Sequence, residues 1–303
     1  MIAYIQYLLF RLICWAAQKL SFRMADRVGR MLGRIVFSVI KVRKNVTLDN
    51  LRRAFPERTE ADIRLIAKSA YENYGIAIIE FLWASNKSVD VIRQVVRVAH
   101  ADVMTTALSK GKGVILLSGH FGAWEFLIPA PFAYFNVQVT GLAQRQSNVR
   151  VDAIIDGIRR RFGNDTIPMG VASRGVLQAL AKGNIIIILG DQSASKESEY
   201  VQFFGRPAAT HRGAAAFSLK ARAPIVMGFV VRQPDGTHVL TFEEVEQSDL
   251  DPTKKENVLE LTRRHVAVLE KWIRKHPDHW LWMHKRWKHS EYHAQQPALT
   301  EAE

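Results

Sequence analysis

Residues Ile185–Leu189 are five consecutive aliphatic residues with no polar side chain among them. A strand with one face in water alternates apolar and polar residues, whereas a strand covered on both faces is apolar throughout. From about residue 95, such stretches alternate with segments of helical periodicity. We expect strands at residues 95–99, 114–117, 137–143, 185–189, 225–231 and 239–242, and helices near residues 101–110, 122–135, 149–162, 173–182, 212–222 and 254–275. The sequence therefore predicts an α/β domain with a central mixed, largely parallel sheet flanked by helices.

The expected strand at residues 114–117 leads into a turn that contains His120, and Glu125 follows five positions later. In a continuous α-helix, residues five apart lie about 140° apart around the axis, so their side chains diverge. The two can meet only if His120 lies in the turn and Glu125 in the first turns of the next helix. That arrangement provides a base and a carboxylate that orients it, as in hydroxyl activation. A buried histidine bonded to the backbone is the structural alternative, and the spacing alone leaves both open.

Other polar residues are expected at the same edge of the sheet, where ligands of open α/β sheets bind. Arg145 follows the strand at residues 137–143, and Arg159 and Arg161 close the next helix. Arginine suits phosphate or carboxylate recognition, but arginines at a helix end can also simply complement the helix dipole. Asp191 and Gln192 follow the run 185–189, where a site residue and a turn-forming residue are equally expected.

Two segments further along the chain are additional candidates for ligand binding. Phe204 lies in an apolar loop that precedes Thr210, at the start of an expected helix, so the two could line an apolar pocket and bind an anion. Thr210 could instead only cap the helix. Residues 277–288 mix tryptophan with lysine and arginine, which suits a membrane–water interface or stacking on nucleic-acid bases. The histidines there show no ligand spacing, so no metal is expected.

The formal net charge of +13 is concentrated near the two ends of the chain. Residues 1–60 hold twelve Lys or Arg against four Asp or Glu, and residues 271–289 hold six against one. Two basic zones around a nearly neutral centre favour contact with an anionic surface, either lipid or nucleic acid. The single cysteine, Cys14, excludes an intramolecular disulfide and fits a reducing compartment.

The first 45 residues predict two helices that lie on a membrane face. Residues 2–17 are strongly apolar and aromatic but interrupted by Arg11, and they fall short of the roughly 20 residues of a spanning helix. Residues 28–42 carry Arg30, Arg34 and Lys41 at near-helical spacing, which we interpret as directed toward lipid phosphates. A helical hairpin packed on the catalytic domain and a single span remain open. We expect the catalytic domain at residues 46–290 and a loose tail at 291–303.

A capping-box pattern at residues 59–62 predicts the start of a long helix, with apolar residues recurring at helical spacing up to Phe81. Glu80 falls within the apolar face of that helix. We interpret it as a structural carboxylate.

In this order along the chain, the motifs resemble the lysophospholipid acyltransferase superfamily, and most closely its lipid A biosynthesis acyltransferase branch, the lauroyl and myristoyl transferases. The central motif is His-x4-Glu in the context Ser-Gly-His-Phe-Gly-Ala-Trp-Glu. It is joined by Arg43–Asn45, Asn50–Pro56, Glu80, Asp191-Gln192, Phe203–Gly205 and His279–Lys288. The resemblance covers nearly the whole chain. Ser118 departs from it, since many relatives have asparagine there.

The resemblance implies a glycerol-phosphate-acyltransferase-like sandwich and an O-acyltransferase activity. The donor would be an acyl thioester of acyl carrier protein or coenzyme A, without any other cofactor, and the acceptor a hydroxyl of a membrane glycolipid, expected to be a lipid A precursor. His120 would be the general base and Glu125 would orient it, with Arg159 or Arg161 as candidates to stabilise the oxyanion. The implied location is the cytoplasmic face of a bacterial inner membrane, with no nucleic-acid partner. A different glycolipid or lysophospholipid acceptor, or a lipid or thioester hydrolase using the same dyad, is the alternative.

Overall fold

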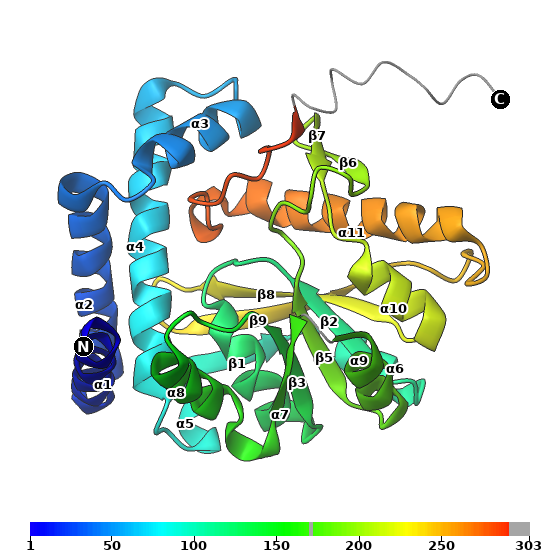
Figure 1. Cartoon of the computed structure of the whole chain (residues 1–303), viewed down its shortest axis with the longest axis horizontal. Helices are drawn as coiled ribbons and strands as arrows, with labels where there is room; N and C mark the ends of the chain where they lie inside the picture. Colours follow the sequence, from blue (N-terminus) through cyan, green and yellow to red (C-terminus); the bar gives the residue numbers. More distant parts are fainter. Residues whose placement is uncertain (170–171, 291–303) are drawn as a thin grey trace.

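The computed structural model describes residues 1–169 and 172–290, in which a seven-stranded sheet lies between layers of helices (Figure 1). The strand order is β1-β9-β8-β2-β5-β3-β4, and every neighbouring pair is parallel except β8 with β9. The strands are β1 (Val96–Ala99), β2 (Val114–Ser118), β3 (Val139–Ala143), β4 (Asp165–Pro168), β5 (Ile185–Leu189), β8 (Ile225–Arg232) and β9 (His238–Glu244). The predicted mixed, largely parallel sheet is therefore confirmed. The sequence did not predict β4 or a separate hairpin of β6 (Tyr200–Phe203) and β7 (Arg206–Ala209).

The central strands β2 and β5 carry apolar side chains on both faces, as their unbroken apolar sequences predict. Within β2, Ile115 and Leu117 pack in the core on one face of the sheet, and Leu116 packs in the core on the other. The first face is covered by α9 (Ala172–Ala181), α10 (Gly213–Ala221) and α11 (Lys255–Lys275). The second is covered by α5 (Val89–Val95), α6 (Ala101–Ser109) and α7 (Pro129–Phe135) (Figure 1).

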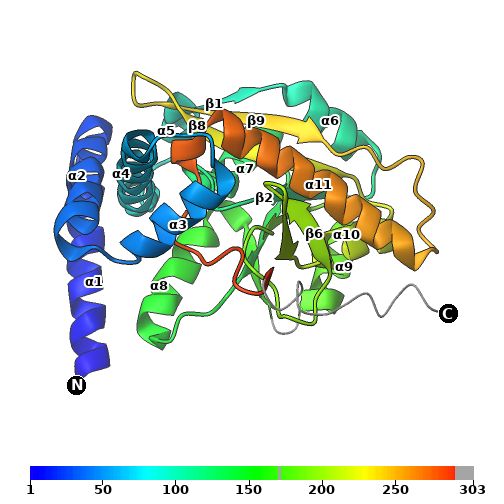
Figure 2. The same ribbon diagram turned by 90° about the horizontal axis from the view of Figure 1, so that it is seen from above.

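The N-terminal helices stand at one side of the sheet. These are α1 (Ile2–Lys19), α2 (Phe22–Ile35), the π-helix η1 (Val36–Ile40), α3 (Lys44–Ala54) and α4 (Glu60–Ala84). Figure 2 shows α1 and α2 beside α4, and Glu80 of α4 bonds Arg232 of β8 and His238 of β9. The predicted capping box begins α4, with reciprocal hydrogen bonds between Thr59 and Asp62. None of the helices in the described ranges is both long and apolar enough to cross a membrane.

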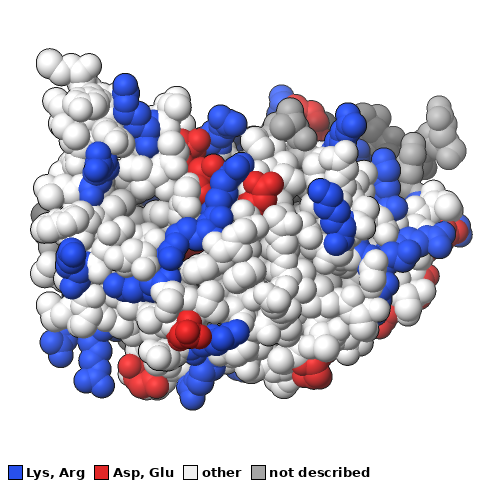
Figure 3. All heavy atoms as spheres, turned by 90° about the horizontal axis from the view of Figure 1, so that it is seen from below, with Lys and Arg blue, Asp and Glu red and all other residues white. Residues whose placement is uncertain are grey.

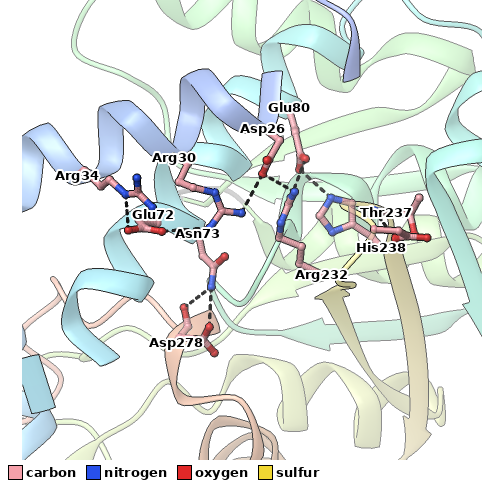
Figure 4. Close-up of polar contacts among 11 residues, drawn as sticks. Asp26, Arg30, Arg34, Glu72, Asn73, Glu80, Arg232, Thr237, His238 and Asp278 are labelled. Carbon is pink, nitrogen blue, oxygen red and sulfur yellow. Dashed lines mark hydrogen bonds and ion pairs between the residues drawn. The ribbon is translucent and has the colours of Figure 1, made fainter. Parts of the chain in front are cut away.

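The contact between α2 and α4 is close and partly ionic. A Cβ atom on Gly33 would lie 2.2 Å from the carbonyl oxygen of Tyr71, so only glycine permits this approach. Arg34 Nε lies 2.8 Å from Glu72, and Arg30 lies 3.1 Å from the same carboxylate (Figure 4). The interpretation that Arg30 and Arg34 are directed toward lipid phosphates is therefore wrong, because both are paired with α4.

The domain division at residue 45 stays a prediction. The tail predicted to be loose, residues 291–303, lies outside the described residues. Within residues 1–169 and 172–290, the remaining helices are α8 (Val149–Arg159) and the short 3-10 turns η2 (Trp124–Leu127), η3 (Arg161–Gly163) and η5 (Pro277–His279).

Candidate active site

His120 and Asp191 lie side by side because β2 and β5 are parallel neighbours. Ser118, the last residue of β2, is in register with Leu189, the last residue of β5, and each strand is followed by a glycine and then by the site residue. His120 Nδ1 lies 2.9 Å from Asp191 Oδ1, and the backbone N–H of His120 donates to Asp191 Oδ2 over 2.9 Å. His120 thus sits in the turn at the carboxyl edge of the sheet, where the sequence placed it.

The Asp191 carboxylate is buried and ionised. Burial alone would raise the pKa of Asp191, but the charge and hydrogen bonds of His120, together with the indole N–H of Trp280, lower it to about 2. At His120, burial lowers the pKa, but the negative charge and hydrogen bond of Asp191 outweigh it and hold the pKa above its ordinary value. Because an ionised carboxylate can only accept, His120 Nδ1 carries the donated proton. The neutral ring therefore keeps the lone pair on Nε2, where it can act as a base.

His120 lines a cavity of about 470 Å³, which is within the usual range for small-molecule sites. Trp124, Glu125, Arg159 and Gln192 also line this cavity. The structure therefore brings three of the predicted residues, Glu125, Arg159 and Gln192, together around His120. His211 lines the same cavity and was not predicted.

Glu125 has a different partner from the one the sequence suggested. Residues Trp124–Leu127 form a 3-10 turn, and from it Glu125 meets Arg159 at the end of α8. Arg159 Nε lies 3.1 Å from Glu125 Oε2, and Arg159 Nη2 bonds the other carboxylate oxygen. Burial lowers the pKa of Arg159, but Glu125 raises it by more, so the guanidinium stays charged. Among the described residues, the carboxylate that orients His120 is that of Asp191.

The other predicted binding residues do not line this cavity. Arg161 donates to two backbone carbonyls at the end of α4 and just beyond it, 3.1 and 2.9 Å away. Arg145 is exposed and lines a separate hollow beside α8. Phe204 is buried among aromatic rings of the core. Thr210 is buried and accepts a hydrogen bond from Arg286, so it does not cap α10.

The segment Pro277–Trp287, which we call the strap, lies against the turn that carries His120. Its tryptophans Trp280, Trp282 and Trp287 are 2%, 1% and 4% exposed, so they are core residues and not membrane-interface residues as the composition suggested. The backbone N–H of Leu281 donates to the carbonyl of His120 over 3.0 Å. The strap begins with the 3-10 turn η5 and continues in turns, so it has no periodic pattern by which the sequence could have indicated its burial.

A narrow apolar crevice adjoins the cavity. It is lined mainly by α4, the turn around η2 and α8, and Glu125, Ile128 and Arg159 line both spaces. Phe81, Ile158 and Phe162 are among its apolar walls. The crevice has a volume of about 30 Å³, so its apolar walls lie close together beside the Glu125–Arg159 pair.

The fold and the site together are those of an α/β protein in which an ionised carboxylate holds a histidine at the wall of a ligand-sized cavity, where the histidine can act as a base. A base of this kind activates a hydroxyl or a water for attack on an acyl group. Residues 1–289 match the family model of the bacterial lipid A biosynthesis acyltransferases. The chain belongs to this family and is an O-acyltransferase of lipid A biosynthesis. The family resemblance of the sequence motifs is thereby confirmed.

Three relatives from Escherichia coli (strain K12) are similar over most of their length. The chain is 22% identical to a lipid A biosynthesis palmitoleoyltransferase over 288 residues, and 23% identical to a lauroyltransferase over 289 residues. Each of these alignments covers 91% of this chain and 89% of the relative. Identity to a myristoyltransferase is 25% over 262 residues, covering 86% of this chain and 78% of the relative.

Proposed function

We propose that this protein transfers a fatty acyl chain from an acyl thioester, carried by acyl carrier protein or coenzyme A, to a hydroxyl of a lipid A precursor. The observation that carries the proposal is the His120–Asp191 pair at the wall of a 470 Å³ cavity. The family supports the acceptor, because all three relatives named above are lipid A acyltransferases. A thioester is already activated, so no protein nucleophile is required.

The reaction uses His120 as base and then as acid. His120 Nε2 takes the proton of the acceptor hydroxyl while its oxygen attacks the thioester carbonyl, and Asp191 stabilises the resulting imidazolium. The tetrahedral intermediate expels the thiolate, which receives the proton from His120, so an ester and a free thiol are released. Arg159, charged and at the cavity wall, is positioned by Glu125 to stabilise the oxyanion. Glu125 thus acts through Arg159.

The acyl chain of the donor occupies the crevice beside the Glu125–Arg159 pair. The walls there are apolar, whereas the cavity around His120 also carries polar groups such as Gln192 and His211. This difference separates a site for hydrocarbon from a site for the acceptor hydroxyl and the thioester. The crevice is narrow, so its walls move apart when a chain enters.

The protein binds the cytoplasmic face of a bacterial inner membrane through α1. This helix exposes Ile5, Leu9, Leu12 and Trp15, each more than half exposed. Exposed Arg11 and Lys19 lie on the same helix, and this combination is typical of helices that lie in the membrane interface. An exposed apolar helix on a soluble domain is otherwise an aggregation liability. In a flotation assay with anionic vesicles, the paired substitution Leu9→Glu with Leu12→Glu should leave the protein in the bottom fraction.

The basic surface suits both anionic lipid and the acidic acyl carrier protein. Figure 3 shows lysine and arginine side chains spread over a whole face of the molecule, with acidic side chains in small groups. Steering by these charges accelerates association at low ionic strength. Donor choice is tested by comparing acyl carrier protein and coenzyme A thioesters of the same acyl chain at rising salt, where a carrier-protein donor should lose kcat/KM more steeply.

The proposal is tested with purified full-length protein, an acyl thioester and a lipid A precursor in mixed micelles. Acylated lipid should appear by mass spectrometry only when the acceptor is present, and His120→Ala should remove the activity while far-UV circular dichroism shows that the protein stays folded. Release of free fatty acid at the same rate with and without acceptor would instead identify a hydrolase. Full transfer by His120→Ala would refute the assigned base.

A further inference from the structure

The strap holds the catalytic turn by its backbone. The N–H of Gly122 donates to the carbonyl of His279 over 2.7 Å, and the N–H of Leu281 donates to the carbonyl of His120 over 3.0 Å. Gly122 has a φ of 56°, and a Cβ there would lie 1.8 Å from the carbonyl oxygen of Val230, so the turn is fixed on its other side by β8. The His120 backbone therefore cannot shift without breaking contacts to the strap.

The strap also reaches the carboxylate through Trp280. The indole N–H of Trp280 donates to Asp191 Oδ2 over 2.8 Å, and the Trp280 ring packs on Phe203 and Trp282. The backbone N–H of His120 donates to the same oxygen. Two donors thus converge on Oδ2, which leaves Oδ1 directed at His120 Nδ1. Rotation of an aspartate carboxylate about its Cβ–Cγ bond is otherwise soft, so these donors fix its orientation.

The loop that follows Asp191 is tied to the strap as well. The backbone N–H of Ser193 donates to His284 Nε2 over 2.9 Å, and the side chain of Asn50 on α3 donates to the carbonyls of Trp282 and His284. Burial lowers the pKa of His284, which keeps its ring neutral and able to accept. The position of Asp191 is therefore set from both its side chain and its backbone.

We propose that Trp280 is a positioning residue that orients the Asp191 carboxylate toward His120 and so raises the rate of the acyl transfer. The proposal rests on the proposed function, since it requires His120 to be the base. It explains why an indole stands at a place where packing alone could be met by phenylalanine. Trp280 acts through Asp191 and does not touch the reacting atoms.

A matched pair of substitutions separates positioning from packing. Trp280→Phe and Trp282→Phe each remove one buried indole N–H from the strap, but the N–H of Trp282 donates to the backbone carbonyl of Pro277, over 2.6 Å. Trp280→Phe should lower kcat about tenfold with little change in KM, because a hydrogen bond to a charged group is lost. Its kcat/KM profile should also move toward lower pH, since a misoriented Asp191 holds the pKa of His120 up less strongly. Trp282→Phe should leave kcat and the profile unchanged.

Equal kcat and equal pH profiles in the two variants would overturn the positioning role. If Trp280→Phe does not fold, benzothienylalanine at position 280 keeps the shape of tryptophan and replaces the N–H with sulfur, and the same tenfold loss is expected. Activity retained by that variant would also overturn the proposal. Failure of the proposed function itself is distinguishable, because the wild-type protein would then form no acylated lipid, and failure of the assigned base would show as acyl transfer by His120→Ala.

Discussion

Among the described residues, two histidine–carboxylate pairs combine a buried carboxylate with a similar nitrogen–oxygen distance. His120 and Asp191 are 2.9 Å apart, and His238 and Glu80 are 2.8 Å apart. The His120 side chain is 21% exposed and lines the large cavity, whereas His238 and Glu80 are each 1% exposed. The hollow beside Glu80 and His238 has a volume of about 10 Å³, room for one water molecule at most.

The partners of the two carboxylates also differ. Within the part of the chain that the structure describes, Asp191 accepts hydrogen bonds only from His120 and the uncharged indole of Trp280, and the buried Arg286 acts on it as a charge without a direct bond. Glu80 receives Arg232, which also binds Asp26 of α2, so this pair belongs to an ionic network that joins the N-terminal helices to the sheet (Figure 4). A carboxylate already neutralised by arginine polarises a histidine weakly. The histidine–carboxylate distance therefore does not identify a catalytic pair. Two other features do: the second ring nitrogen of the histidine reaches a cavity, and the other hydrogen-bond donors to the carboxylate are uncharged.

The largest effect expected from this comparison is on turnover. His120→Gln should lower kcat about 10⁴-fold, because the general base is lost, with the melting temperature nearly unchanged. His238→Gln should instead lower the melting temperature and leave kcat nearly unchanged, since His238 belongs to a buried ionic network and touches no substrate. Steady-state kinetics and thermal unfolding of both variants would measure this. A comparable loss of turnover in His238→Gln would mean that the sealed pair also serves catalysis.

Replacing Asp191 or Glu80 with its amide tests the comparison through the pH dependence of kcat/KM. In the proposed mechanism His120 must be neutral, so kcat/KM should rise as pH passes through the His120 pKa, which Asp191 holds above its ordinary value. Asp191→Asn removes this negative charge, so the acidic limb of the profile, where kcat/KM rises with pH, should move to lower pH. In addition, kcat should fall about 10³-fold because the imidazolium loses its stabilising carboxylate. Glu80→Gln should leave the limb in place. A limb that stays fixed in Asp191→Asn would exclude Asp191 as the group acting on the base.

The sealed network should show its effect in stability. Arg232→Met leaves the buried Glu80 carboxylate without its cation, and breaking such a pair should cost about 3 kcal/mol of unfolding free energy. Chemical denaturation followed by far-UV circular dichroism measures this loss, and activity per folded molecule should be preserved. A stable Arg232→Met protein with reduced kcat would place the network within the catalytic machinery instead.

Much of the sheet and the position of His120 could be predicted from the sequence, because both depend on local patterns. Apolar runs such as Ile185–Leu189 mark strands that are buried on both faces, and a histidine just after such a strand lies at the edge where ligands bind. The partner of His120 could not be predicted with the same certainty. Asp191 is 71 residues away and reaches His120 only because β5 is the neighbour of β2, an order that no local pattern contains.

Glu125 and the basic residues of α2 were singled out from the sequence, but their contacts differ from the predicted ones. Spacing allowed Glu125 to meet His120, but a 3-10 turn in place of an α-helix start directs it to Arg159. Arg30 and Arg34 have a spacing that fits lipid phosphates, yet Glu72, a distant residue in sequence, pairs with both. Side-chain direction at a turn and the identity of a distant partner depend on packing, so sequence patterns gave the residues but not their contacts.

The smallest effect is expected at the outer end of the ionic network. The Arg34 side chain is 54% exposed, so its pair with Glu72 is screened by solvent and salt, unlike the pair of Arg232 with Glu80. Arg34→Gln should therefore lower the melting temperature slightly in dilute buffer, and the difference from the wild type should vanish in 1 M NaCl. The destabilisation by Arg232→Met should persist at both salt concentrations, because burial shields that pair from ions. If both variants lost their effect in salt, the network would be solvent-accessible throughout, and burial would no longer separate the structural pair from the catalytic one.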